Sequence, residues 1–446
     1  MVHVVRVSIA PMATDLSSFV RSSAAPKDRV SPMAAKLVGS EILKIAAEIR
    51  ALIAKGQPVC NLTVGDFDPK QFPIPEVLRK NITDAYAAHE TNYPPSNGMP
   101  ELRSAVQRFY ERDLGLKLPL ESILIASGAR PVIYGIYRAV VAEGDEVVYP
   151  VPSWNNNHYV TMLGAKGVTV KCGPESRFLP TRDSLVESLP TARLVCQNSP
   201  LNPTGTAMSR DMVLGISEAI VKENETRERN GQRPVYLMYD HIYWMLTAKG
   251  TQHHTPPELL PEMARYTIFV DGISKAFAAT GVRVGWAVGP VDVIDRMSAI
   301  LGHVGAWAPR AEQIATAKLL DDTGAITTYL GTLRKELAVR LDALHEGFQK
   351  LKASGLPVDS LSPEGAIYLT VRVHPFGKKT AAGKAIETNE DVRKLLLEAA
   401  GVGVVPFQAF GYPGDEGWFR LSVGAVSMRD IDDALPRIGE ALRALG

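Results

Sequence analysis

The sequence predicts an α/β protein, in which a small α+β domain follows a large domain built on a mostly parallel, seven-stranded sheet. Seven short apolar runs between residues 122 and 289 alternate with helical stretches, which is the pattern of a parallel sheet covered by helices on both faces. After residue 310 long helical patterns take over and only a few strands follow. With 446 residues, the chain is also too long for one hydrophobic core, so two domains are expected.

The elements follow from these patterns in chain order. A first helix is expected from Ser40 to Gly56, with Ser40 as N-cap and Gly56 as C-cap, because Ile42, Ile45 and Ile49 lie on one stripe. The strands of the large sheet are expected at 122–127, 145–150, 167–172, 192–198, 234–240, 266–271 and 281–289. The small domain is expected to contain strands at 365–373 and 418–424 and a helix at 389–401.

We therefore expect four segments along the chain. Residues 1–39 form an N-terminal arm, and residues 40–64 form an interdomain helix and a segment of the small domain. Residues 65–315 form the large domain and residues 316–446 the small C-terminal domain.

Composition narrows the possible partners. Lys and Arg number 49 against 48 Asp and Glu, so no basic field favours nucleic acid or a membrane surface. No apolar run is long enough to span a bilayer, and the first thirty residues lack a secretory-signal pattern. The three distant cysteines, Cys60, Cys172 and Cys196, fit buried thiols in a reducing compartment. We expect a cytoplasmic protein without nucleic-acid or membrane partners.

Polar residues gather just after the predicted strands. In open α/β sheets ligands bind beyond the carboxyl ends of the strands, so these residues should meet at one rim of the sheet. They are Gly128, Ala129 and Arg130 after the first strand, Asn198 and Asn202 after the fourth, Asp240 at the end of the fifth and Lys275 after the sixth.

Two features of this rim point to an aldehyde that carries a phosphate. A lysine near an apolar rim loses solvation of its ammonium, which makes Lys275 a better amine nucleophile. The small residues Gly128 and Ala129 before Pro131 mark a helix start whose free N–H groups suit a phosphate, to which Arg283 can add a cation. A solvated lysine and an arginine in a surface salt bridge are the alternatives.

Other residues suit a pyridine ring and a carboxylate. Asp240 could keep a pyridine nitrogen protonated, Tyr243 and Asn202 could donate to a ring oxygen, and Trp154 could stack on the ring. Arg420 lies on an otherwise apolar strand and needs a carboxylate partner. Taken singly, Asp240 could be a helix cap, Asn202 a turn residue and Trp154 a core residue. Together these groups indicate a pyridoxal phosphate site.

The chain resembles the class I/II aminotransferases of fold type I, and among them the aspartate aminotransferases, from about Ser40 to its end. The resemblance is carried by YPPSNGMPELR (93–103), SGA (127–129), GDEVVYPVPSW (144–154), NSPLNPTG (198–205), YDHIY (239–243), SKAFAATGVRVGWAVG (274–289) and FRLS (419–422). The combination is specific because order and spacing both agree, whereas any single piece is not.

The resemblance implies a role for each residue. Lys275 forms the covalent link to pyridoxal 5'-phosphate, and Asp240 pairs with the ring nitrogen. Tyr243 and Asn202 meet the ring oxygen and Trp154 stacks on the ring. Gly128, Ala129, Arg283 and Ser274 surround the phosphate, and Tyr93 reaches the phosphate of a neighbouring subunit, which implies a homodimer with shared sites. Arg420 binds the substrate α-carboxylate, and Gly65 lines the substrate site.

The resemblance also implies the reaction. The amine of an amino acid displaces Lys275, the freed lysine moves a proton, and a 2-oxo acid leaves before a second 2-oxo acid reverses the cycle in a ping-pong mechanism. Arg130 aligns with a basic position that faces the distal carboxylate in some bacterial aspartate aminotransferases, which favours an aspartate or glutamate donor; a helix-start arginine in a surface pair is equally compatible. A β-lyase, or an aminotransferase for aromatic or other neutral amino acids, is the alternative.

Three departures from the family pattern are notable. His241 stands where the family usually has an acidic residue, and Gly272 stands where many relatives have a hydroxyl, so a phosphate donor is expected to be lost. Asn155–Asn157 replace commonly aromatic or aliphatic residues and could remodel the pocket.

A regulator built on this fold would need an added DNA-binding domain, and no extension of that size precedes Ser40. No metal motif is present, so no metal is expected.

Overall fold

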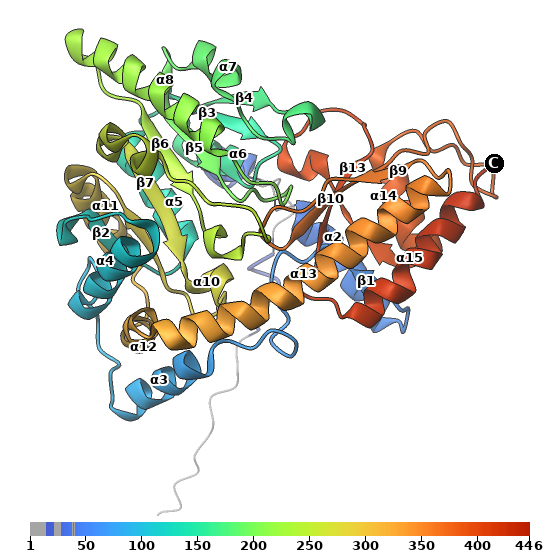
Figure 1. The fold of residues 1–446 in the computed structure, drawn as a ribbon, viewed down its shortest axis with the longest axis horizontal. Helices are drawn as coiled ribbons and strands as arrows, with labels where there is room; N and C mark the ends of the chain where they lie inside the picture. Colours follow the sequence, from blue (N-terminus) through green and yellow to red (C-terminus); the bar gives the residue numbers. More distant parts are fainter. Residues whose placement is uncertain (1–14, 22–27, 38, 40) are drawn as a thin grey trace, which may run out of the picture. The chain divides into compact units, whose positions relative to one another are not determined.

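The computed structural model describes residues 15–21, 28–37, 39 and 41–446. Residues 39–446 form one compact unit, built around a seven-stranded sheet with the order β2-β8-β7-β6-β5-β3-β4 (Figure 1). Its strands are β2 (Ile123–Ala126), β3 (Glu146–Val151), β4 (Lys166–Lys171), β5 (Ala192–Asn198), β6 (Tyr236–Asp240), β7 (Thr267–Gly272) and β8 (Gly285–Val288). Only β8 runs antiparallel to its neighbours, β2 and β7. The predicted mostly parallel sheet is therefore confirmed.

Each strand lies on a predicted apolar run, with one notable difference in length. The run 281–289 was expected to be extended throughout, but β8 begins only at Gly285. Arg283 has a φ of +64°, a left-handed conformation that a strand cannot contain. The start of this run is therefore a turn, and the turn places Arg283 at the end of the sheet.

Helices bury both faces of the sheet, as its near-continuous apolar strands require. Side chains of one face pack with helices α5 (Ala129–Val140), α6 (Asn156–Leu163) and α11 (Val291–Val304). Side chains of the other face pack with α4 (Pro100–Leu114), α8 (Arg210–Arg229) and α12 (Arg310–Asp321). Because successive residues of a strand point to opposite faces, Met238 and Asp240 share the α5 face, whereas Tyr239 belongs to the α4 face.

A second, smaller set of strands lies outside the large sheet, and all of them except β1 follow that sheet in the chain. An antiparallel sheet has the order β12-β13-β10-β9, and a short parallel pair joins β1 to β11. These strands are β1 (Cys60–Asn61), β9 (Val358–Ser360), β10 (Tyr368–Val373), β11 (Val402–Gly403), β12 (Val405–Pro406) and β13 (Trp418–Ser422). The associated helices are α13 (Thr323–Ala353), α14 (Asn389–Ala400) and α15 (Met428–Arg443). The expected strands and helix of this region are present; the boundary near residue 315 stays a prediction.

The first long helix begins and ends close to its predicted limits. It is α2 (Glu41–Ala54), and Gly56 follows it with a φ of +82°. The predicted N-cap, Ser40, lies outside the described residues. The other helices are α1 (Pro32–Lys36), which belongs to the separate segment before residue 39, α3 (Glu76–Ala87), α7 (Arg182–Leu185), α9 (Pro256–Leu259) and α10 (Ile273–Ala276). Among the residues that the structure describes, no helix is both long and apolar enough to cross a bilayer.

Candidate active site

A cavity of about 680 Å³ lies where the carboxyl ends of the central strands meet the small sheet. This is the position expected for a ligand in an open α/β fold. Eleven of the residues expected in the site line the cavity: Gly65, Ala129, Arg130, Trp154, Asn202, Asp240, Tyr243, Ser274, Lys275, Arg283 and Arg420. Gly128 precedes them as the N-cap of α5, and Tyr93 lies apart.

Lys275 sits on the short helix α10, directly after β7. Its Nζ donates a hydrogen bond to the carbonyl of Gly65 at 2.7 Å. Burial lowers the pKa of Lys275 to about 8, and the nearby positive charges of Arg420, Arg130 and Arg283 act in the same direction. A larger fraction of this amine is therefore neutral at physiological pH than of an exposed lysine.

The corner before Lys275 depends on a glycine. A Cβ atom at Gly272 would approach Cα of Gly285 to 2.7 Å, because β7 and β8 pass close together there. The sequence suggested that glycine at position 272 costs the site a phosphate donor. The structure shows why a glycine is required there: no side chain fits at this position.

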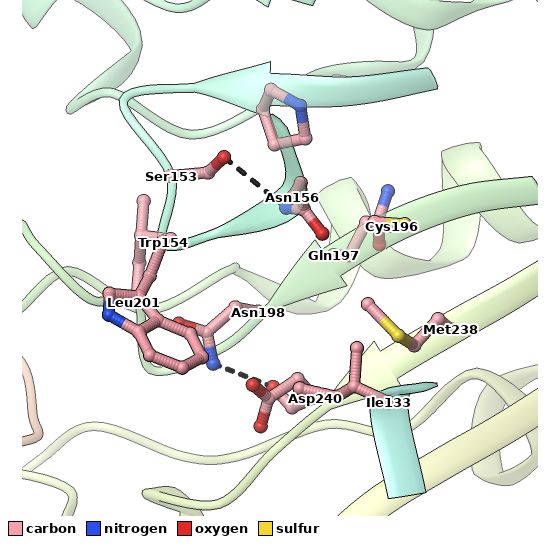
Figure 2. A pocket seen from close by; sticks show the side chains of 11 residues that line it. Ile133, Ser153, Trp154, Asn156, Cys196, Gln197, Asn198, Leu201, Met238 and Asp240 are labelled. Carbon is pink, nitrogen blue, oxygen red and sulfur yellow. Dashed lines mark hydrogen bonds between the residues drawn. The ribbon is translucent and has the colours of Figure 1, made fainter. Parts of the chain in front are cut away.

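Asp240 ends β6 and points into the cavity. Its Oδ1 accepts a hydrogen bond from the backbone of Ile242 at 3.1 Å, while its own carbonyl accepts one from Asn198 Nδ2 at 2.8 Å (Figure 2). Burial raises the pKa of Asp240 to about 7, against the lowering effects of that backbone bond and of Lys275. A positively charged partner for this carboxylate would restore its usual acidity.

A second, small cavity lies between Trp154 and Asp240 and the interior of the sheet (Figure 2). Its volume is about 20 Å³, enough for roughly one water molecule. Ser153, Asn156 and Gln197 supply its polar lining.

Arg420 is almost fully buried, at 2% exposure, and has no carboxylate partner among the described residues. Its guanidinium donates to Asn202 Oδ1 at 3.1 Å and to the carbonyl of Thr63 at 2.6 Å. The rings of Tyr368 and Phe410 lie 4.7 and 4.9 Å from it, and its Nε is left without an acceptor. A buried, underused guanidinium facing a cavity is a receptor for a carboxylate.

Tyr243 and Tyr368 meet beside Arg420. Their hydroxyls are 2.7 Å apart, so one donates to the other and a single O–H of the pair is left to donate elsewhere. Burial raises the pKa of both phenols, which therefore act as neutral hydrogen-bond donors or acceptors.

The start of α5 and Arg283 form a cup at the other end of the cavity. Gly128 has a φ of +93°, and a Cβ atom there would collide with the Arg283 guanidinium. Arg283 donates to the carbonyls of Thr280 and Ser127 at 2.7 and 2.8 Å. Ser274 lines the cavity. Free N–H groups at a helix start and a guanidinium form an anion site.

Arg130 and the asparagines after Trp154 shape the remaining wall. The Arg130 guanidinium lies 4.8 Å from the centre of the Trp154 ring. Asn155 is left-handed at the start of α6 and lines the cavity. Asn156 is buried, where it accepts from Tyr137 Oη at 3.0 Å and donates to Ser153. Asn156 thus fixes the loop that carries Trp154, whereas Asn157 is exposed.

Tyr93 does not line the cavity. It is 81% exposed and packs only edge-on against Trp307.

Several lining residues escaped the sequence reasoning. Thr63, Asp66, Tyr368 and Arg50 all line the cavity without having been proposed. Of these, only Tyr368 carried a usable signal, because it lies on the predicted strand 365–373.

Comparisons with known proteins agree with this geometry. The family model described as aminotransferase class I and II matches residues 57–438. An aspartate aminotransferase of Rhizobium meliloti (strain 1021) is 32% identical over 419 residues, covering 93% of this chain and 96% of the relative. The crystal structure of the aspartate aminotransferase from Rhizobium meliloti superposes with a TM-score of 0.84 at 31% identity, covering 94% of this chain and 100% of that one.

A second solved structure is the aspartate aminotransferase from Thermus thermophilus with maleate, at a TM-score of 0.82 and 27% identity, covering 93% and 99% of the two chains. The fold is that of the fold type I aminotransferases, as expected. The chain belongs to the aminotransferase class I and II family, and it is accordingly an aminotransferase.

Proposed function

We propose that this aminotransferase uses pyridoxal phosphate to move the amino group of aspartate or glutamate to a 2-oxo acid. The observation that carries the proposal is the charge of the cavity wall. Five cationic side chains, Arg50, Arg130, Lys275, Arg283 and Arg420, face two carboxylates, Asp66 and Asp240. Such a wall suits a cofactor that carries a phosphate together with a substrate that carries more than one carboxylate.

The residues present fit the cofactor. Ala129 at the start of α5 offers an N–H, and Ser274 and Arg283 offer a hydroxyl and a cation for a phosphate, whereas the N–H of Gly128 is donated to the carbonyl of Ala126 at 2.7 Å. Asp240 is a buried carboxylate that lacks a full counter-charge, which suits a protonated ring nitrogen. Trp154 presents a flat face to the cavity, and Tyr243 and Asn202 lie where they can meet a ring oxygen.

When bound, the cofactor supplies an aldehyde for the amine and a ring that accepts electrons from the substrate Cα. The protein supplies the remaining chemistry. Lys275, with a pKa of about 8, would hold the cofactor and would serve as the base that moves a proton at the substrate Cα. Asp240, ionised beside a cation, would keep the ring nitrogen protonated.

Substrate recognition is assigned to two arginines and a glycine. Arg420, with its free Nε, binds the α-carboxylate, and the absence of a side chain at Gly65 keeps that approach open, since a Cβ there would lie 2.9 Å from Tyr368 Oη. Arg130, stacked on Trp154, binds the distal carboxylate. The relatives named aspartate aminotransferases, one of them solved with the dicarboxylate maleate, support this donor class.

The donor class is tested by comparing the two arginines. Arg420→Ala is expected to impair every donor, because a charge-assisted, buried pair typically contributes about 2–5 kcal/mol. Arg130→Ala is expected to lower kcat/KM for aspartate and glutamate at least about tenfold while sparing alanine and aromatic donors. An unchanged ratio between acidic and neutral donors would assign Arg130 a structural role and favour the alternative, a neutral or aromatic donor.

The same assay separates an aminotransferase from a β-lyase. Stoichiometric exchange between an amino acid and a 2-oxo acid is expected. Release of ammonia with pyruvate would indicate lyase chemistry at the same lysine.

We further propose a cytoplasmic homodimer with shared active sites and the large and small domains given above. The exposed Tyr93 is available to a second subunit, where it would contact the phosphate. The three cysteines are free and buried, which supports a reducing compartment.

A further inference from the structure

A buried polar network lies behind the active site, on the α4 face of the sheet. His241 and Asp271 are one residue out of phase with Asp240 and Val270, a registered pair of β6 and β7, so their side chains point to the opposite face. There they meet Tyr110 of α4. His241 has 0% exposure and Asp271 has 2%, so water cannot substitute for their partners.

The contacts of this network define one hydrogen-bonding pattern. Tyr110 Oη lies 2.9 Å from His241 Nε2 and donates to Asp271 Oδ2 at 3.2 Å. With its only hydrogen used, Tyr110 must accept from His241 Nε2–H. His241 Nδ1 then accepts from His253 Nε2, 3.3 Å away. His241 is thus neutral, in agreement with burial lowering its pKa.

Asp271 is the acidic member of the network. Trp244 Nε1 and the backbone of Gly272 donate to it at 3.1 and 2.7 Å, so together with Tyr110 three donors face its oxygens. Such donors favour the ionised form. Burial opposes them and raises the pKa of Asp271 to about 7, with Asp240 adding repulsion.

No lysine or arginine among the described residues forms an ion pair with Asp271; its closest basic group is His241 Nε2 at 3.6 Å. The titratable groups that face the network are Tyr110 from α4, Tyr239 from β6, and His253 from the loop before α9. Asp240, on the opposite face of β6, acts on Asp271 only through its charge. Trp286 of β8 closes it with an N–H donated to Tyr110.

We propose that Asp271, held by Tyr110 and His241, is a positioning residue whose negative charge tunes the proton affinity of the active site through the end of the sheet. The network is tied to both functional groups: His241 directly follows Asp240, and Asp271 precedes Lys275 by four residues. The charges of Asp271 and Asp240 repel each other, and the same negative charge would favour a positive charge at Lys275 and at the ring that Lys275 holds. The inference rests on the proposed function for that ring.

The test is the near-isosteric variant Asp271→Asn in the holoenzyme loaded with pyridoxal phosphate. Loss of a negative charge makes a proton at the lysine–cofactor link less stable, so the pH midpoint of the cofactor's absorbance change is expected to fall by about half a unit or more. Tyr110→Phe is the matched control, since it breaks three hydrogen bonds of the network and leaves the Asp271 carboxyl in place. The midpoint of this control is expected not to fall.

The stability of the apoprotein tests the role of Asp271 independently of the proposed cofactor. In the apoprotein, Asp271 binds a proton more tightly than in the unfolded chain, so it lowers the free energy of unfolding as pH rises from about 4 to about 7. Asp271→Asn is expected to flatten that part of the stability profile, and Tyr110→Phe is not. An Asp271→Asn variant with an unchanged midpoint and an unchanged profile, whatever its melting temperature, would overturn the inference. A wild-type protein that binds no cofactor would instead refute the proposed function. The stability profile of the apoprotein would then be the test of the role of Asp271.

Discussion

At the scale of the residue, the site is built from groups whose charged forms are destabilised by burial. Asp240 and Lys275 have opposite ordinary charges, but burial moves both toward neutrality, raising one pKa to about 7 and lowering the other to about 8. The two side chains form no ion pair within 4.0 Å. The apoprotein therefore carries unsatisfied groups that a ligand can satisfy, which is how functional sites commonly trade stability for activity.

Asp240→Asn tests this trade at one residue. The folded apoprotein binds the Asp240 proton more tightly than the unfolded chain does, so the free energy of unfolding falls as pH rises from about 4 to about 7. The variant should therefore be more stable than wild type at pH 8, by about 4 kcal/mol, with a smaller difference at pH 5. Chemical denaturation at both pH values measures the effect, and turnover should fall severely. A variant that is no more stable at pH 8 would mean that Asp240 is already satisfied within the protein.

At the scale of the element, the start of α5 is shaped around Arg283. Gly128 has no side chain because the guanidinium occupies that space, and Arg283 takes a left-handed conformation to reach the carbonyl of Ser127. One helix start and one turn thus form the anion site jointly.

Gly128→Ala is expected to displace Arg283 and to weaken cofactor binding at least about tenfold. Gly144→Ala is a matched control, because Gly144 also has a positive φ, of +81°, but has open space where a Cβ would lie. Both variants should lose about 1 kcal/mol of stability from the backbone. Cofactor titration by absorbance distinguishes them, and equal affinities would show that the cup does not hold the phosphate.

The elements were the most predictable part of the molecule, since hydrophobic periodicity marks strands and their ends locally. Lys275, Asp240 and Asn202 were found because they follow predicted strands. The turn conformation of Arg283 was not found, because it depends on contacts with Ser127 and Thr280 rather than on the run around it.

Pairings between distant elements carried no signal in the sequence. Tyr110 precedes His241 by 131 residues, and Tyr243 precedes Tyr368 by 125. These residues become partners because α4 packs on the large sheet and because the small sheet forms one wall of the cavity. His241 was noticed as unusual, and only the fold supplies its partner.

At the scale of the whole molecule, the proposed shared site makes one subunit depend on another. Lys275→Ala and Tyr93→Ala proteins are each expected to be impaired. If Tyr93 serves the neighbouring subunit, a mixed dimer contains one site with both native residues, and mixing the two proteins after mild dissociation should restore activity. Activity equal to the average of the two parents would mean that Tyr93 acts within its own subunit or not at the site.

Lys275 is the residue proposed to hold the cofactor. The direct measurement is borohydride reduction of the protein incubated with pyridoxal phosphate, followed by peptide mapping by mass spectrometry. One modified peptide is expected, with the reduced cofactor on Lys275, and no such modification in Lys275→Ala. A label on another lysine, or none at all, would contradict it.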